Sequence, residues 1–121
     1  MKLNEEIKIE IDFSNLGEIY SGNPNDFILI LKKIQQEYSK YLDLLVDQIL
    51  TENMDDFRKT RHKISATLLL LKLDHFHEYL SFLKEHFAQG FSEKDEIILN
   101  LRKCFQEIQN NLSRKLTELE P

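Results

Sequence analysis

The chain has 121 residues, of which 41% are hydrophobic and 31% are charged, a composition typical of one compact globular domain. With three Gly, two Pro and one Cys, the sequence excludes a turn-rich sandwich or barrel, an internal disulfide and a cysteine-rich zinc module. The net charge of -5 argues against nucleic-acid binding, which needs a basic face. The first residues lack the apolar stretch of a signal peptide, and no apolar run has the length of a membrane span. We therefore expect a cytoplasmic protein without a membrane segment.

The N-terminal residues, 1–24, are predicted to form an extended arm and one short helix. Apolar residues occupy every second position in the arm, with the period of a β-strand, at Ile7, Ile9, Ile11 and Phe13. A lone strand has no sheet partner unless two copies of the chain pair through it, so we interpret this segment as an arm laid over a helical body. Ser14 is the expected N-cap of a helix that ends near Tyr20, and residues 21–25 form the clearest break in the chain.

Four longer segments carry apolar residues at steps of three and four, the spacing of one buried helix face. They run from residue 26 to 50, from 54 to 71, from 74 to 89, and from the motif at residues 92–95 to 119. Asn25 and Asn53 are the expected caps of the first and second of these helices. Gly90 is placed to end the third, and residues 92–95 (SEKD) resemble a capping box before the last.

The links between these four helices are short, so consecutive helices are expected to be antiparallel neighbours. The predicted fold class is therefore all-α: an antiparallel up-down-up-down four-helix bundle over residues 25–119. The arm and short helix of residues 1–24 precede it, and residues 1–121 form a single domain.

The segment from Met54 to Leu71 separates into a core face and an exposed face. With Phe57 set at zero and a step of about 100° per residue, Ile64 and Leu68 fall within about 40° of it, whereas His62 falls at roughly 140°. His62 is therefore predicted to point into solvent. One turn before it are the cations Arg58 and Lys59, one turn after it are the small residues Ser65 and Ala66, and beyond these is Leu69.

This stripe has the composition of a docking face around an accessible imidazole. A neutral imidazole is nucleophilic near pH 7, because its reference pKa is about 6.5, and its ring nitrogen can accept a phosphoryl group. Nearby cations can offset the charge that the phosphoryl group adds. Without further support, an exposed histidine on a helix is more often an ordinary surface residue, with Arg58 and Lys59 solvated or paired with Asp55.

Residues 13–27 (FSNLGEIYSGNPNDF) and 55–64 (DDFRKTRHKI) resemble the opening helix and turn, and the phospho-acceptor segment, of histidine-containing phosphotransfer (HPt) domains. The resemblance covers nearly the whole chain. It implies a phosphorelay protein of two-component signal transduction that accepts a phosphoryl group on His62 from a receiver-domain aspartate and passes it to another receiver. The family pattern His-x-x-Lys-Gly is not kept, because Ser65 stands at the Lys position and Ala66 at the Gly position.

The same resemblance implies roles for the residues around His62. Ser65, Arg58 and Lys59 are expected to stabilise the phosphoryl group, and Ala66 and Leu69 to contact the partner. The expected partners are response-regulator receiver domains and a hybrid histidine kinase. No cofactor is expected on this chain, since magnesium belongs to the receiver. The protein is expected to be a monomer and not an independent enzyme.

Two other functions stay open at this point. Because the Lys-Gly pair is replaced, the chain could be an HPt-like adaptor that binds a receiver or kinase without carrying phosphate. A bundle that holds a metal or small ligand is the third reading, since Asp74 with His77, or His75 with Glu78, has i,i+3 spacing; no Glu-x-x-His pair of a di-iron bundle is present. Cys104 is interpreted as a core thiol.

Overall fold

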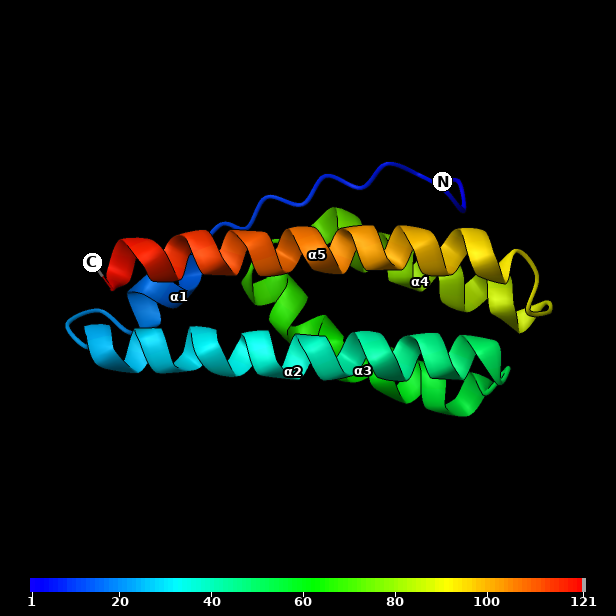
Figure 1. Ribbon diagram of the computed structural model, residues 1–121, viewed down its shortest axis with the longest axis horizontal. Helices are drawn as coiled ribbons and strands as arrows, with labels where there is room; N and C mark the ends of the chain where they lie inside the picture. Colours follow the sequence, from blue (N-terminus) through cyan, green and yellow to red (C-terminus); the bar gives the residue numbers. More distant parts are fainter. Residues whose placement is uncertain (121) are drawn as a thin grey trace.

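The computed structural model describes residues 1–120, and within them the chain is all-α, as predicted (Figure 1). The predicted domain ends at residue 121, which lies outside the described residues. One short and four long helices follow each other along the chain: α1 (Ser14–Ile19), α2 (Pro24–Leu50), α3 (Met54–Leu70), α4 (Asp74–Ala88) and α5 (Lys94–Leu119).

The long helices pack side by side around one core. α2 packs against both α3 and α5, and α3 also packs against α4 (Figure 1). The rings of Phe76 on α4 and Phe105 on α5 meet edge to face, with centroids 5.6 Å apart. None of the helices within residues 1–120 combines the length and the apolar character needed to cross a bilayer.

Each link between long helices contains one non-glycine residue in the left-handed region: Glu52, Lys72 or Glu93, with φ of 54°, 57° and 61°. After α3, the backbone N–H of Leu73 donates to the carbonyl of Leu68 at 2.8 Å, and the link after α2 uses the same pattern. This is the hydrogen-bonding of a Schellman motif, which satisfies carbonyls at the end of a helix. The strained residues are not glycines, so the packing of the flanking helices must offset their cost.

The helix starts agree with the sequence only in part. Asn53 caps α3 as predicted, since its side chain accepts from the backbone N–H of Asp56 at 3.1 Å. The prediction for Ser14 is wrong, because Ser14 is already helical and its N–H donates to Asp12 Oδ1 at 2.9 Å.

Two further cap predictions are also wrong. α2 begins two residues earlier than an N-cap at Asn25 would place it, because Pro24, with its fixed φ, forms the first position of the helix. The expected capping box fails because Glu93 takes the N-cap position in a left-handed conformation and makes no side-chain cap hydrogen bond.

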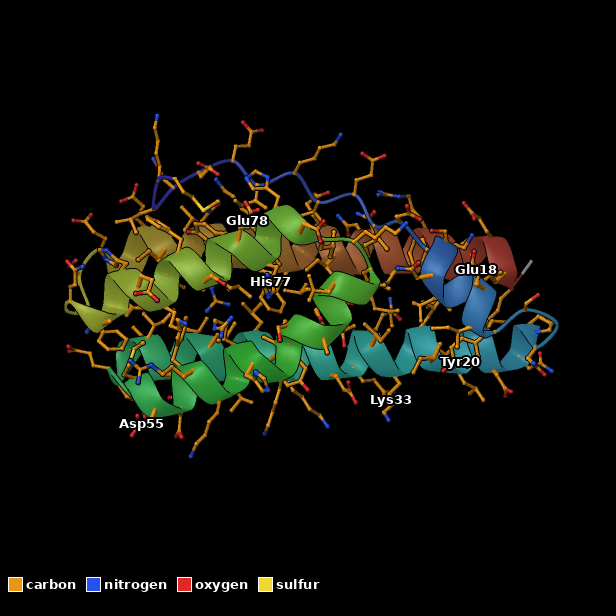
Figure 2. The ribbon with its side chains drawn as sticks, turned by 180° about the vertical axis from the view of Figure 1, so that it is seen from behind. Glu18, Tyr20, Lys33, Asp55, His77 and Glu78 are labelled. Carbon is orange, nitrogen blue, oxygen red and sulfur yellow. The ribbon has the colours of Figure 1, made fainter. Side chains whose placement is uncertain are left out.

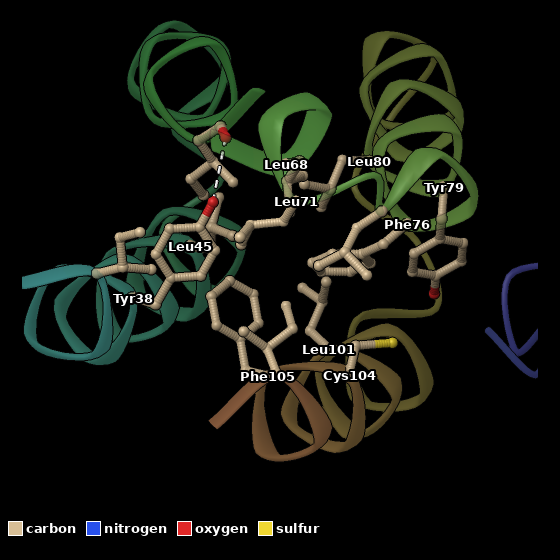
Figure 3. Close-up of a cluster of buried hydrophobic side chains, with 14 of the residues drawn as sticks. Tyr38, Leu45, Leu68, Leu71, Phe76, Tyr79, Leu80, Leu101, Cys104 and Phe105 are labelled. Carbon is tan, nitrogen blue, oxygen red and sulfur yellow. Dashed lines mark hydrogen bonds between the residues drawn. The ribbon is translucent and has the colours of Figure 1, made fainter. Parts of the chain in front are cut away.

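The core contains the residues that the helical spacing selected. Phe57, Ile64 and Leu68 of the predicted stripe are all fully buried. Figure 3 shows Leu68 among the equally buried Leu71, Tyr38 and Phe76. Burial of one such side chain contributes roughly 1.5–3 kcal/mol. The Tyr38 hydroxyl donates to the backbone carbonyl of Ile64 at 3.2 Å, which ties α2 to the middle of α3. Burial raises the pKa of this phenol well above its usual value.

The N-terminal segment is an extended arm along α4 and α5, as the sequence indicated (Figure 1). Its backbone is held by helix side chains in place of a neighbouring strand. The Ile11 N–H donates to Asn111 Oδ1 at 3.1 Å, and Asn111 Nδ2 donates to the Ile9 carbonyl at 3.4 Å. Asn100 Nδ2 donates to the Glu5 carbonyl at 2.9 Å, and the Tyr79 hydroxyl donates to the arm at the Leu3 carbonyl.

Candidate functional site

His62 lies on the solvent side of α3, as predicted. Its side chain is exposed, while Phe57 and Ile64 on the other face of the same helix are fully buried. The arm does not cover it. The hydrogen bonds from the arm and α1 reach α3 at its C-terminal end, where the Asp12 N–H donates to the Leu71 carbonyl at 3.1 Å and Asn15 Nδ2 to the Leu70 carbonyl at 3.4 Å. The imidazole is therefore open to a partner.

The predicted neighbours of His62 share its face. Arg58 and Lys59, one turn before it, are exposed, and neither forms an ion pair with a carboxylate of residues 1–120. Ala66 is exposed one turn after it, and Leu69 is 50% exposed at the far end. The stripe thus presents positive charge, an imidazole, a small side chain and an apolar side chain in that order.

Ser65 differs from the other members of the stripe. It is half-buried, and its hydroxyl donates to the backbone carbonyl of His62 at 2.7 Å. A phosphoryl oxygen accepts hydrogen bonds, so Ser65 could serve it only after its hydroxyl rotates away from that carbonyl. Ser65 is therefore available to a phosphoryl group only at the cost of an existing hydrogen bond.

On one side of the stripe, α2 packs along α3. Gln48 Nε2 donates to Thr60 Oγ1 at 2.9 Å, and the Tyr38 hydroxyl donates to the Ile64 carbonyl at 3.2 Å. Leu44 lies between these two contacts on α2, as His62 does on α3. Leu44 and His62 therefore lie at a similar height along the two helices. Leu44 is 46% exposed, so it adds an apolar side chain to the surface at this height.

On the other side of the stripe, α4 packs against α3. The rings of Phe57 and Phe87 lie edge to face with centroids 5.3 Å apart, and Arg61 Nη1 contacts Ser81 Oγ at 3.4 Å. Figure 2 looks onto these two helices and shows His77 on the side of α4 nearer to α3. On the helical count from Phe57, Arg61 lies at about 40°, at the edge of the core stripe, and the HPt resemblance gives it no role. The sequence does offer one signal for Arg61. A charged residue at the edge of a core stripe is partly desolvated and needs a hydrogen-bonding or charged partner.

The residues considered for a metal do not gather. Within residues 1–120, no group of three or more His, Cys, Asp or Glu side chains is arranged to hold an ion. His75 is engaged with the arm instead, since its Nε2 lies 2.8 Å from Glu5 Oε2. The hydrogen bond from His75 lowers the pKa of the Glu5 carboxyl.

Cys104 is buried, as expected for a core thiol, and Figure 3 shows its sulfur directed toward the arm. Burial raises the pKa of this thiol to about 12. A thiol with such a pKa is almost wholly protonated near neutral pH and is a poor nucleophile.

Comparison of this chain with models of protein families, with curated proteins and with solved structures found no match. The exposed face of α3 and the side chains that flank it are therefore the features of this chain that point to a function.

Proposed function

We propose that this chain is a histidine phosphotransfer protein of a multistep phosphorelay, with His62 as its phospho-acceptor. The single observation that carries the proposal is the exposed imidazole of His62 beside two cations that pair with no carboxylate of the described residues, on a helix whose other face is fixed in the core. In this proposal the four long helices form an antiparallel up-down-up-down bundle, and the protein acts in the cytoplasm as a phosphoryl carrier rather than as an independent enzyme.

The chemistry is a transfer between two nucleophiles. An unprotonated ring nitrogen of His62 attacks the phosphorus of an aspartyl phosphate on a receiver domain, in line with the bond that breaks. A P–N bond forms as the P–O bond breaks, and the aspartate leaves as a carboxylate with the electron pair. The second ring nitrogen of His62 keeps its proton. The receiver supplies magnesium, which this chain does not need to hold, and transfer to a second receiver reverses these steps.

The face around His62 suits a receiver as partner. Arg58 and Lys59 provide positive charge for the phosphoryl oxygens and for acidic groups of the receiver. Ala66 leaves room for close approach, and Leu69 and Leu44 provide apolar contact on either side. The apolar area that these residues offer to a partner is small. A small interface suits the short-lived complexes that a phosphoryl carrier forms.

The proposal is tested by phosphorylating the purified chain with phosphoramidate, a small phosphoryl donor to histidine, and then adding receiver domains. The wild-type protein should gain one acid-labile phosphoryl group and lose it to a receiver, whereas His62→Gln should gain none. His77→Gln on α4 is the matched control, because it removes a histidine from the neighbouring helix and should label normally. Undiminished labelling of His62→Gln would remove His62 from the mechanism.

A second candidate is an adaptor that binds a receiver or kinase without carrying phosphate. The observation that favours it is the hydroxyl of Ser65, which is already bonded to the His62 carbonyl and adds no charge beside the ring. An adaptor would bind a receiver with the same affinity in wild type and His62→Gln and would show no acid-labile phosphate. Under the carrier proposal, Ser65→Lys should increase the yield of phosphorylated protein, because it adds a cation beside the phosphoryl group.

A further inference from the structure

Arg61 is a half-buried cation between α3 and α4. Its Nη1 contacts Ser81 Oγ at 3.4 Å, and its buried Nε has no hydrogen-bond partner among residues 1–120. No carboxylate of the described chain forms an ion pair with it. A guanidinium has five N–H donors, and a desolvated charge without a counter-charge is costly. The group is therefore poised to bind an anion that comes from outside the chain.

The surroundings of Arg61 add to this positive charge. The Phe57–Phe87 and Arg61–Ser81 contacts set the antiparallel register of α3 and α4, and on this register Arg58 is level with Lys84. Lys84 lies 3.6 Å from Glu85, whose side chain is 74% exposed, so their pair is a weak solvent-exposed one. Three cations thus lie along this edge of α3 and α4, although the chain as a whole is acidic.

The direction of His62 brings it toward the same edge. With Phe57 at zero, Arg61 lies at about 40° on α3, Arg58 at about 100° and His62 at about 140°, and all three lean to the side on which α4 packs. Arg58 is one turn from His62, and Arg61 is its neighbour in sequence. A phosphoryl group on the His62 ring would therefore extend from this side of α3.

We propose that Arg61 and Ser81, assisted by Arg58, bind the oxygens of the phosphoryl group carried by His62. The inference rests on the proposed function and names the residues that hold the phosphoryl group. Arg61 supplies a forked set of charged donors, and such pairs with phosphate are stronger than neutral hydrogen bonds. Partial burial makes its charge less screened by salt than those of the exposed Arg58 and Lys59. The Ser81 hydroxyl, which now accepts from Arg61, remains free to donate to a phosphoryl oxygen.

The first test does not need a phosphorylated protein. Inorganic phosphate is titrated into wild type and variants at constant ionic strength, and backbone amide NMR shifts of α3 and α4 are followed. Arg61→Gln should weaken phosphate binding by about tenfold or more, the loss of one charged hydrogen-bonding group. Ser81→Ala, a milder change that is safe for folding, should weaken it by a smaller factor. Lys63→Gln is the matched control, because it removes the same charge from the α2 side of the helix and should change little.

The second test measures the lifetime of the acid-labile phosphoryl group at neutral pH after labelling with phosphoramidate. Arg61→Gln should shorten the lifetime several-fold relative to Lys63→Gln. Equal phosphate affinity of Arg61→Gln and Lys63→Gln would overturn the inference. If phosphate binding depends on Arg61 but His62 is never labelled, the proposed function fails and a phosphate site on α3 and α4 stands. If His62 labels and neither readout depends on Arg61, the function stands and this inference fails.

Discussion

Asn111→Ala should detach the middle of the N-terminal arm. Asn111 is buried on α5, accepts from the Ile11 N–H at 3.1 Å and donates to the Ile9 carbonyl at 3.4 Å. Removal of the acceptor leaves the N–H of a buried residue without a partner, which costs about 1–3 kcal/mol. Ala is a better helix former than Asn and returns roughly 0.5 kcal/mol. We therefore expect a net loss of about 0.5–2.5 kcal/mol in the free energy of unfolding.

Two measurements check this value. Urea denaturation followed by circular dichroism gives the free energy of unfolding, and amide hydrogen exchange at Ile11 locates the loss. Asn110→Ala is the matched control, because it makes the same exchange one residue earlier, where the side chain accepts only from Gln106 and does not touch the arm. If the two variants were equally stable, or if Ile11 stayed protected in Asn111→Ala, the amide would not be what holds the arm.

Three further predictions concern the core, acid and the buried thiol. Leu68→Ala should lower the free energy of unfolding by about 2–5 kcal/mol in urea denaturation, whereas its neighbour Leu69→Ala should cost little; equal effects would contradict the two-faced description of α3. Hydrogen bonds from Ser14, and to a lesser extent from Lys72, lower the pKa of Asp12 from 3.8 to about 2. The Asp12 carboxylate therefore stabilises the folded state fully above about pH 4, and this contribution is lost as the pH falls from about 4 to 2. Asp12→Asn should remove that part of the acid titration of stability, and an unchanged curve would refute it. Cys104, with its pKa raised to about 12, should react slowly with thiol reagents at pH 8 and much faster after deletion of residues 1–8; equal rates would show that the arm does not shield it.

The sequence predicted the faces of α3 because a helix repeats at a nearly constant angle. One buried residue, Phe57, was enough to place Ile64 and Leu68 inside and His62 outside, and all three predictions are confirmed. The arm was also predictable, since its alternating apolar residues had no second strand to pair with. Its anchors on α4 and α5 were not, because Asn100 and Asn111 carry no local signal that they replace the hydrogen bonds of a strand.

The site was less predictable than the face that carries it. Helical spacing describes one helix at a time, so it could select Arg58, Lys59, Ala66 and Leu69 as neighbours of His62 but could not say what the next helix adds. The contact of Arg61 with Ser81 depends on the register of α3 against α4, which the core packing of both helices determines. The hydrogen bond from the Ser65 hydroxyl to the His62 carbonyl depends on the side-chain rotamer of Ser65. Residue type alone allows several staggered rotamers and does not select one.

α4 contacts the arm on one side and Arg61 on another, which separates the arm from the proposed phosphoryl site. Tyr79 and His75 bind the arm from one side of α4, whereas Ser81 meets Arg61 on the other. A change in the arm can reach α3 most directly at the α3–α4 link, where Lys72 pairs with Asp12 at 3.3 Å. The α3–α4 link lies more than two helical turns after His62. An exposed ion pair such as Lys72–Asp12 also contributes little free energy. The arm is therefore better understood as a stabiliser of α4 and α5 than as a regulator of the imidazole.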